Sequence, residues 1–382
     1  MSVAAQRRSR LGSRLAIHAA PQAALAATSS RLEISEMQAF PVREPVSKRA
    51  YTVIRVRTKS GLTGYGECAR ASSEELTRAR QFLIGRPASA YTAARQLGSV
   101  SGAVDVALLD ILAQSCKAPI YRLLGGPTRN KVRAMTTLRG ANDLQLMAEM
   151  KRGLDAGFLA FCVPVPEPAA RNQGQAYARA ARTRMETLRF AAGNAKVDFV
   201  LNGAEHLTPG DAATLAAELE KFHLLWFDEP CRVSNLSTIR KIAGETVTPL
   251  GFGREITDPG TFQDLLREGL IDIVRPDLLR NGISQTKRLA AMAEPYYTAV
   301  APHHEGGPIS TAAAIHLAAS LPNFFIQHIP LPAAPEDARM RAELVTDSIE
   351  MVRDGFAALP NAPGLGVAVN EKALEHYKDG EA

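Results

Sequence analysis

The hydrophobic pattern of the chain changes near residue 131, and the part before that point predicts a small mixed domain. The stretch 51–58, YTVIRVRT, alternates apolar and polar residues after an earlier apolar run, and the turn SGLTG follows it. This order predicts an antiparallel hairpin. Apolar residues then recur at helical spacing over 73–84 and 103–115. We therefore expect an α+β domain over residues 31–131.

After this point, short apolar runs alternate with amphipathic helical segments. The eight runs, each interpreted as a strand, are 132–138, 159–165, 197–203, 224–230, 248–253, 271–277, 298–304 and 324–329. Eight strands separated by helices, at steps of about 25 residues, are typical of a closed parallel barrel. A doubly wound open sheet has the same order of elements, so the order alone leaves it open.

Polar residues gather at the C-terminal ends of runs two to eight, where barrel enzymes assemble their sites. They are Cys162, Asn202, Asp228, Arg254, Asp277, His303 and His328. From Asn202 onward, successive members lie 23 to 26 residues apart. Unrelated surface residues would rarely be so regular, and the pattern favours the barrel.

Charge adds little to this picture. The chain has 382 residues and a formal net charge of +6, but four arginines of that excess lie in the acid-free residues 1–30. The rest is nearly neutral and lacks a basic stripe, so we expect no nucleic-acid partner. We expect residues 1–30 to be a disordered extension, with a targeting segment, and hence export, as the alternative.

Cysteine use and hydropathy indicate the compartment. The four cysteines, Cys68, Cys116, Cys162 and Cys231, lie far apart and form no CxxC pair. This argues against a zinc knuckle or a dense disulfide framework and fits the cytoplasm. No apolar run approaches the roughly 20 residues of a membrane helix, so we expect no membrane partner.

Several motifs in order give the chain a family resemblance. They are SGLTGYGEC, VDVALLDILAQ, YRLLGG, FDEP, VRPD, APHHEGGP and PGLGV. From about Arg31 to its end, the chain resembles the enolase superfamily, in the branch of mandelate racemase, muconate lactonizing enzyme and the sugar-acid dehydratases. The resemblance implies an α/β fold: a modified (β/α)7β barrel over 132–345, an N-terminal α+β capping domain, and a segment 346–382 that returns to the cap.

The same resemblance implies a chemistry. Such enzymes remove the proton α to a carboxylate and hold the resulting enediolate on Mg²⁺, because that C–H is a very weak acid. The implied partner is a small carboxylate, and the family's common homo-oligomers suggest self-association by analogy.

The implied metal site departs from the family pattern. Its three carboxylates would fall at Asn202, Asp228 and Arg254, whose formal charges cancel. An arginine keeps its proton in proteins and repels a cation. We therefore expect a divergent member whose Mg²⁺ binding is weak or absent. The alternative is that Glu229 and Glu255 join Asp228 to rebuild the site, although successive strand residues face opposite sides of a sheet.

The implied acid–base residues survive in part. Asp277 and His303 match the family's Asp–His dyad, in which the carboxylate fixes the imidazole tautomer. His304 is a rival for that position, and a buried pair without catalytic duty is the structural alternative. His328 stands where the family has a glutamate. Cys162 replaces the family's lysine base and is expected to be a buried small hydrophobe, with a thiol at the substrate as the alternative.

The loop FPVREPVSKRA lies where the family's specificity loop closes over the barrel. It contains Arg43, Lys48 and Arg49, which would meet an acidic substrate. Flexible surface cations are the alternative interpretation.

Three functions follow from these residues. The first, which we favour, is an enzyme of dehydratase or racemase type that needs no metal, in which Arg254 holds the substrate carboxylate and His303 moves the α-proton. The second is a binding or regulatory barrel whose former metal site is filled by an Arg254–Asp228 ion pair. The third is a Mg²⁺-dependent acid-sugar dehydratase with the ligands Asp228, Glu229 and Glu255.

Overall fold

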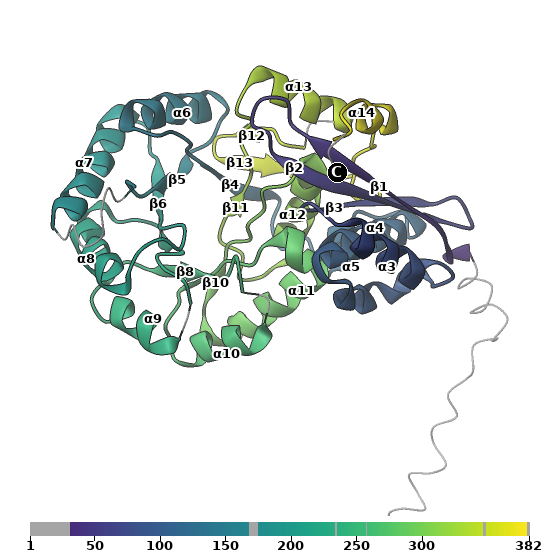
Figure 1. Cartoon of the computed structure of the whole chain (residues 1–382), viewed down its shortest axis with the longest axis horizontal. Coiled ribbons are helices and arrows are strands. Elements are labelled where there is room, and N and C mark those ends of the chain that lie inside the picture. Colours follow the sequence, from purple (N-terminus) through teal and green to yellow (C-terminus); the bar gives the residue numbers. More distant parts are fainter. Residues whose placement is uncertain (1–30, 168–174, 234, 257, 347–348, 380–382) are drawn as a thin grey trace, which may run out of the picture.

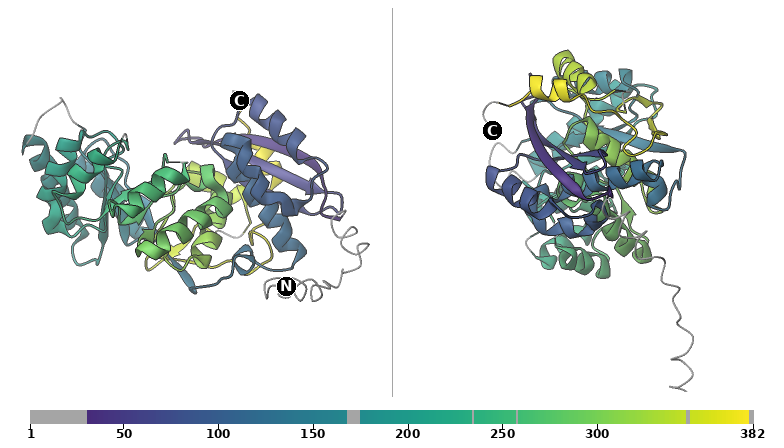
Figure 2. Two further views of the ribbon diagram at one scale, coloured as in Figure 1. Left: turned by 90° about the horizontal axis from the view of Figure 1, so that it is seen from below. Right: turned by 90° about the vertical axis from the view of Figure 1, so that its right-hand side faces the viewer.

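A computed structural model of the chain describes residues 31–167, 175–233, 235–256, 258–346 and 349–379. The expectation for residues 1–30 therefore lies outside the described residues. Figure 1 shows a ring of strands and helices with a smaller β-rich unit beside it. Figure 2 shows the two units at opposite ends of the molecule.

The smaller unit is built on an antiparallel sheet of three strands in the order β1-β2-β3. The strands are β1 (Ile34–Arg43), β2 (Ala50–Thr58) and β3 (Thr63–Cys68). The helices that pack with this sheet are α3 (Ser73–Leu83), the 3-10 segment η1 (Ala88–Val100), α4 (Ser101–Ser115) and α5 (Ile120–Leu123). Ser72 and Glu75 form a capping box at the start of α3, which satisfies two amides that the helix leaves free.

Strand β2 is more buried than its alternating sequence indicates, since all but two of its residues are buried. Its arginines explain the apparent polar face, because Arg55 is held by Glu36, Gln38 and Glu371 and so lies buried while paired.

The larger unit is a parallel barrel. Its strands are β4 (Lys131–Thr137), β5 (Ala160–Pro164), β6 (Asp198–Asn202), β7 (Phe227–Asp228), β8 (Leu250–Phe252), β9 (Ile273–Val274), β10 (Ala299–Val300) and β11 (Gln327–His328). Neighbours in sequence pair in parallel from β4 to β10, and β11 pairs with β4. The ring closes where Val300 bridges Phe324. All eight predicted runs therefore contain a strand.

Helices alternate with these strands and cover the outside of the ring (Figure 1). They are α6 (Asp143–Asp155), α7 (Gln175–Ala192), α8 (Pro209–Leu219), α9 (Leu236–Ala243), α10 (Pro259–Arg267), α11 (Leu278–Ala293) and α12 (Pro308–Ser320). Several begin at a polar cap: Thr208, Asp258 and Asp277 each accept a hydrogen bond from an amide in the first turn. The last of these, Asp277, is also a candidate site residue.

The C-terminal segment contacts both units. Helix α14 (Glu371–His376) packs against β1 of the small unit. Helix α13 (Pro335–Leu344) packs against α14. The hairpin β12 (Val352–Arg353) and β13 (Phe356–Ala358) instead extends the barrel sheet beside β4. The family resemblance implied a return to the cap and gave no indication of this hairpin.

Buried polar contacts fix the small unit on the barrel. Glu67 of β3 accepts hydrogen bonds from the backbone amides of Gly307, Ile309 and Ser310 at the start of α12. A carboxylate stabilises a helix N-terminus through its free amides and dipole. This contact holds the loop before α12, which contains His303, under the small unit.

One described helical stretch, Ala88–Ser115, is long and apolar enough to cross a membrane by length and composition. It was not anticipated from the sequence. Two thirds of its most apolar window is buried within the protein (67%), as in the core helix of a folded domain.

Candidate active site

The side chains expected to form the metal site meet at the ends of β6, β7 and β8, but an arginine occupies the centre. Arg254 Nη2 donates to Asn202 Oδ1 at 2.8 Å and lies 3.5 Å from Asp228 Oδ2. Its Nε lies 3.8 Å from Glu229 Oε1. The nearby carboxylates outweigh burial and raise the pKa of Arg254, so it remains a cation.

Asp228 is fully buried and has a second arginine of its own. Arg275 Nε donates to Asp228 Oδ1 at 2.7 Å, and Trp226 Nε1 donates to the same oxygen at 2.8 Å. Burial on its own would raise the pKa of Asp228, but the charges of Arg275 and Arg254 and these hydrogen bonds lower it. Asp228 is therefore an anion engaged on both sides.

Glu229 has a different environment from its neighbour. Its backbone is in the left-handed region, with φ 43°, and its Oε1 accepts from the amides of Gly253 and Arg254 at 2.7 and 2.8 Å. Burial and the charge of Asp228 raise the pKa of Glu229 to about 7. The carboxyl therefore holds the chain after β8 in place and is partly protonated near neutrality.

Across the barrel mouth, Asp277 and His303 form the expected pair. The residues bridge in parallel, and His303 Nδ1 lies 2.9 Å from Asp277 Oδ2. Burial lowers the pKa of His303, but the neighbouring carboxylates of Asp277 and Glu305 raise it above its usual value overall. Because Asp277 engages Nδ1, the other ring nitrogen, Nε2, faces the barrel mouth.

Of the two adjacent histidines, His303 is therefore the one that pairs with Asp277. His304 is fully buried, and among the described residues neither of its ring nitrogens has a hydrogen-bond partner. Burial, with the neighbouring His328 and His303, lowers the pKa of His304 well below its usual value. The structure does not place His304 with the other candidate substrate contacts.

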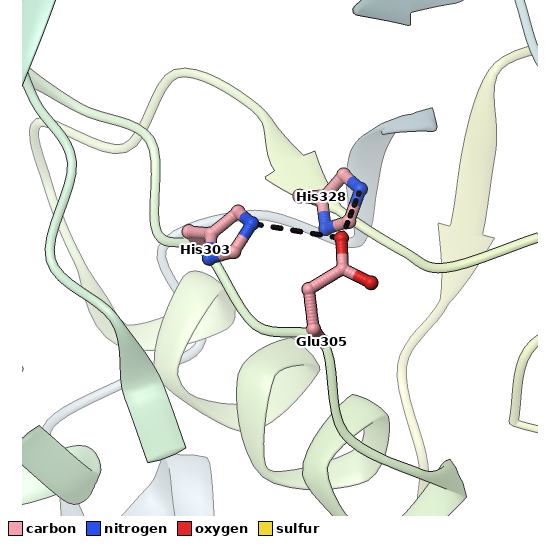
Figure 3. A group of neighbouring side chains, drawn as sticks. All are labelled: His303, Glu305 and His328. Atoms are coloured by element: carbon pink, nitrogen blue, oxygen red, sulfur yellow. Dashed lines mark ion pairs between the residues drawn. The ribbon is translucent and has the colours of Figure 1, made fainter. Parts of the chain in front are cut away.

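Figure 3 shows His328 and Glu305 beside His303. The rings of His303 and His328 stack with centroids 4.9 Å apart and planes at 16°. Glu305 Oε1 lies 3.7 Å from His303 Nε2 and 3.8 Å from His328 Nε2. Burial lowers the pKa of His328 to about 3, so its ring is neutral at physiological pH.

Of the three cations in the cap loop, Arg49 is the one that reaches this cluster. Its Nη2 lies 3.2 Å from Glu305 Oε2, and its Nη1 lies 3.5 Å from Glu44 Oε1. Arg43 pairs with Asp379 near the C-terminus, and Lys48 donates to the backbone carbonyl of Pro45. The structure thus brings Arg49 to the site and leaves Arg43 and Lys48 outside it.

Cys162 lies in the middle of β5, not at its end as expected, and is 2% exposed. Burial, reinforced by the charge of Asp228, raises the pKa of its thiol to about 12. Since the thiolate is the reactive form, this cysteine is chemically quiet near neutral pH. The environment agrees with the interpretation as a small buried hydrophobe.

Family models match most of the chain. Residues 36–125 match the mandelate racemase / muconate lactonizing enzyme N-terminal domain, and residues 132–373 match the enolase C-terminal domain-like family. The chain belongs to the enolase superfamily, in the branch of mandelate racemase. The resemblance drawn from its motifs and the fold it implied are confirmed.

Similar proteins within this superfamily have named activities. A D-galactonate dehydratase of Verminephrobacter eiseniae is 30% identical over 356 residues, covering 85% of this chain and 91% of the relative. A D-xylonate dehydratase of Haloferax volcanii is 27% identical over 361 residues, covering 87% and 86%.

Solved structures share the fold. A mandelate racemase/muconate lactonizing enzyme-like protein from Rubrobacter xylanophilus superposes with a TM-score of 0.82 at 22% identity, covering 92% of this chain and 99% of the other. An enolase structure from Agrobacterium radiobacter, bound to Na and L-malate, has a TM-score of 0.81 at 26% identity, covering 91% and 95%.

Enolase-superfamily enzymes generally use Mg²⁺, and the residues at that position here do not fit it. Mg²⁺ needs several oxygen ligands in near-octahedral array. Asn202 Oδ1 instead accepts from Arg254 and from the amide of Ala204, and both oxygens of Asp228 face arginines. The alternative ligand is Glu255, whose Oε2 lies 2.6 Å from Arg280 Nη2. The side chain of Glu255 is 55% exposed. The structure does not bring Glu255 to Asp228.

Sequence reasoning missed several residues of this site. Glu305 lies directly after the histidine doublet, and Arg275 lies in the motif VRPD. Both therefore belong to motifs whose neighbouring residues, His303 and Asp277, were the candidates. An arginine inside an otherwise apolar strand was the signal for a buried partner, which is Asp228. Arg139 donates to Glu305 Oε2 at 2.6 Å from a loop that carried no such signal.

Proposed function

We propose that this protein removes the proton α to the carboxylate of a small hydroxy acid, a sugar acid in the first instance, and eliminates water from it. The observation that carries the proposal is the His303–Asp277 pair, which faces the cation Arg254 across one barrel mouth. The relatives named D-galactonate and D-xylonate dehydratase support the substrate class. L-malate in the Agrobacterium structure is also a hydroxy acid.

Arg254 would hold the substrate carboxylate. Arg275 already balances Asp228, and the raised pKa of Glu229 removes part of its charge near neutrality, so a positive charge remains at Arg254. The side chain of Arg254 is 19% exposed. A planar guanidinium binds a carboxylate through two hydrogen bonds. It would stabilise the enediolate less than a compact divalent ion, so we expect slow turnover or an unusually acidic α-proton.

His303 would be the base. Asp277 fixes its Nδ1, so Nε2 takes the proton when the α C–H bond breaks. The imidazolium then returns that proton to the β-hydroxyl as the C–O bond breaks, which releases water and leaves an enol that becomes the 2-keto acid. His328 stacks on His303, with its Nδ1 at the carbonyl of His304 and its Nε2 at Thr137 Oγ1, and would position the base.

We further propose that the reaction proceeds without Mg²⁺ between Asn202 and Asp228. Support comes from the arginine at that position and from its hydrogen bond to Asn202. We propose a cytoplasmic location, which fits four cysteines that are free thiols. A small carboxylate remains the proposed partner, with neither nucleic acid nor membrane involved, and self-association remains an expectation by analogy.

A second candidate is a binding or regulatory barrel that has lost the chemistry. The observation that favours it is the contact of 3.5 Å between Arg254 and Asp228, which fills the former metal position. Such a protein would keep the carboxylate-binding arginine without turnover. The third hypothesis, a Mg²⁺ site of Asp228, Glu229 and Glu255, gains no support from the placement of Glu255.

Exchange of the α-proton in D₂O tests the proposal. The full chain, treated with a chelator, is incubated with D-galactonate, D-xylonate and related acids, and deuterium incorporation is followed by NMR. We expect exchange or 2-keto acid formation with at least one acid, and a loss of about 100-fold or more in His303→Ala. His376→Ala is the control, because His376 is exposed in α14. Equal inertness of wild type and His303→Ala toward every acid that binds would favour the binding protein.

A further inference from the structure

We infer that His303, Glu305 and His328 form a binding site for a divalent transition metal of the zinc class. Their ligand atoms, two imidazole nitrogens and one carboxylate oxygen, all lie within 4.8 Å of one another (Figure 3). This group lies across the barrel mouth from the family's Mg²⁺ position. The inference does not rest on the proposed reaction.

The distances leave room for an ion after a small adjustment of the three side chains. The two imidazole nitrogens lie 3.7 and 3.8 Å from Glu305 Oε1, which is beyond a good hydrogen bond. Zinc ligands at about 2.0–2.1 Å in tetrahedral array lie roughly 3.3 Å apart. Each imidazole nitrogen therefore needs to approach Glu305 Oε1 by a few tenths of an ångström. The two rings need to approach each other by a larger amount.

Both rings have a partner on Nδ1, but they stack with planes at 16°, so one ring must turn for the Nε2 lone pairs of both to meet one ion. Asp277 engages Nδ1 of His303 at 2.9 Å, and the backbone carbonyl of His304 engages Nδ1 of His328 at 2.9 Å. Metal-binding histidines typically donate their second N–H to a carboxylate or a backbone carbonyl, which fixes the tautomer and leaves Nε2 for the metal. One contact of each kind is present, and the dashed lines in Figure 3 join both Nε2 atoms to Glu305 Oε1.

Glu305 divides its two oxygens between different partners. Oε2 accepts from Arg139 at 2.6 Å and lies 3.2 Å from Arg49, whereas Oε1 faces the two rings. The arginines therefore hold the carboxylate in place through one oxygen and leave the other for an ion. Their positive charges oppose a cation, so we expect micromolar rather than nanomolar affinity. Two imidazoles favour zinc-class ions over Mg²⁺, which prefers oxygen.

Three protein ligands leave at least one coordination position open, as in zinc sites that bind water or a substrate oxygen. Thr137 Oγ1, 3.0 Å from His328 Nε2, would have to release that nitrogen when an ion binds. A metal and a proton compete for Nε2 of His303. Bound zinc would consequently prevent this imidazole from acting as the base proposed above.

Equilibrium dialysis of the untagged full chain against ZnCl₂ tests the inference. We expect one Zn²⁺ bound per chain with micromolar affinity, and affinity at least about tenfold lower in Glu305→Gln and in His328→Gln. His376→Ala and Cys116→Ser are matched controls, since His376 and Cys116 are exposed donors elsewhere. Circular dichroism of each variant checks that it is folded.

Co²⁺ supplies a second measurement on the same proteins. We expect visible absorption that indicates nitrogen ligands in the wild type and in both controls, and its loss in Glu305→Gln and His328→Gln. Zinc stoichiometry and affinity unchanged in both of these variants, or no zinc bound by the wild type, would overturn the inference. Neither result bears on deuterium exchange by the chelator-treated protein, so the two proposals fail separately.

Discussion

The barrel mouth has two halves that differ in the charged groups at their centre. The arginine half, at the ends of β6 to β8, contains Asn202, Asp228, Arg254 and Arg275, whose formal charges sum to +1. The imidazole half, at the ends of β9 to β11, contains Asp277, His303, Glu305 and His328 and directs two ring nitrogens at one carboxylate oxygen.

The two halves differ in whether a positive charge of the chain occupies the place of a metal ion. In the arginine half, a guanidinium lies where the superfamily's carboxylates gather around a divalent ion, so the positive charge is part of the chain. In the imidazole half, the polar atoms converge without a cation of the chain at their centre. The half that the family uses for metal contains a guanidinium at that position, and the half that it uses for acid–base chemistry contains the imidazole and carboxylate ligands of the proposed zinc site.

The largest expected effect concerns catalysis in the imidazole half. Asp277→Asn keeps the cap of α11 but loses the charge that fixes His303, and we expect α-proton exchange to fall by about 10²- to 10⁴-fold. Asp258→Asn is a matched control, because Asp258 caps α10 in the same way. Exchange rates decide the outcome, and equal rates in both variants would show that the charge of Asp277 is not needed to make His303 a base.

The next effect concerns stability of the arginine half. Arg275→Met leaves Asp228 buried with a weaker partner, and we expect the free energy of unfolding to fall by about 3–5 kcal/mol. Arg267→Met removes an exposed pair with Asp264 and should cost at most about 1 kcal/mol. Urea unfolding measures both, and a small loss for Arg275→Met would show that the two halves do not differ in this respect.

A double variant tests whether the arginine half is what excludes Mg²⁺. Asn202→Asp with Arg254→Glu restores three carboxylates at the ends of β6, β7 and β8. We expect Mg²⁺ at 100 times its dissociation constant to stabilise this variant by about 2.7 kcal/mol, with no such effect on the wild type. Thermal melts with and without Mg²⁺ give the result, and Ca²⁺-free buffer with chelator is the control. An equal shift of the wild type would contradict the assignment.

The smallest effect is a pH dependence in the arginine half. The folded protein raises the pKa of Glu229 to about 7, so it binds this proton more tightly than the unfolded chain. The contribution of this carboxyl to stability is therefore full at low pH and is lost as the pH rises from about 4.5 through 7. Glu229→Gln should flatten that part of the stability curve, as followed by urea unfolding between pH 5 and pH 8. A curve parallel to the wild type would refute the shift.

The strands of the barrel could be predicted because each apolar run is buried on both faces and ends in a polar residue at a regular interval. Asp277 and His303 follow from the same regularity, since parallel strands bring their ends together. The hairpin β12–β13 could not be predicted, because its pairing with β4 joins residues far apart in sequence and each of its strands is only two or three residues long.

Side-chain direction limits the site in the same way. Sequence spacing placed Arg43, Lys48 and Arg49 in one loop, but only the folded loop directs Arg49 to Glu305 and Arg43 to Asp379. Arg275 signalled a buried partner but the sequence did not identify it as Asp228, and Glu305 carried no signal for Arg49 and Arg139 because these come from distant loops. The formal charges of Asn202, Asp228 and Arg254 could be compared with the family's three carboxylates from the sequence alone. The distances between His303, Glu305 and His328 could be known only from the structure.

Anomalous diffraction from crystals of the full chain soaked in Mn²⁺ or Zn²⁺ tests the difference between the two halves most directly, with Mn²⁺ in place of Mg²⁺. The account predicts a zinc peak between His303, Glu305 and His328 and no manganese peak between Asn202 and Asp228. A manganese peak at the ends of β6 to β8 with Arg254 displaced, together with an empty imidazole half, would contradict it.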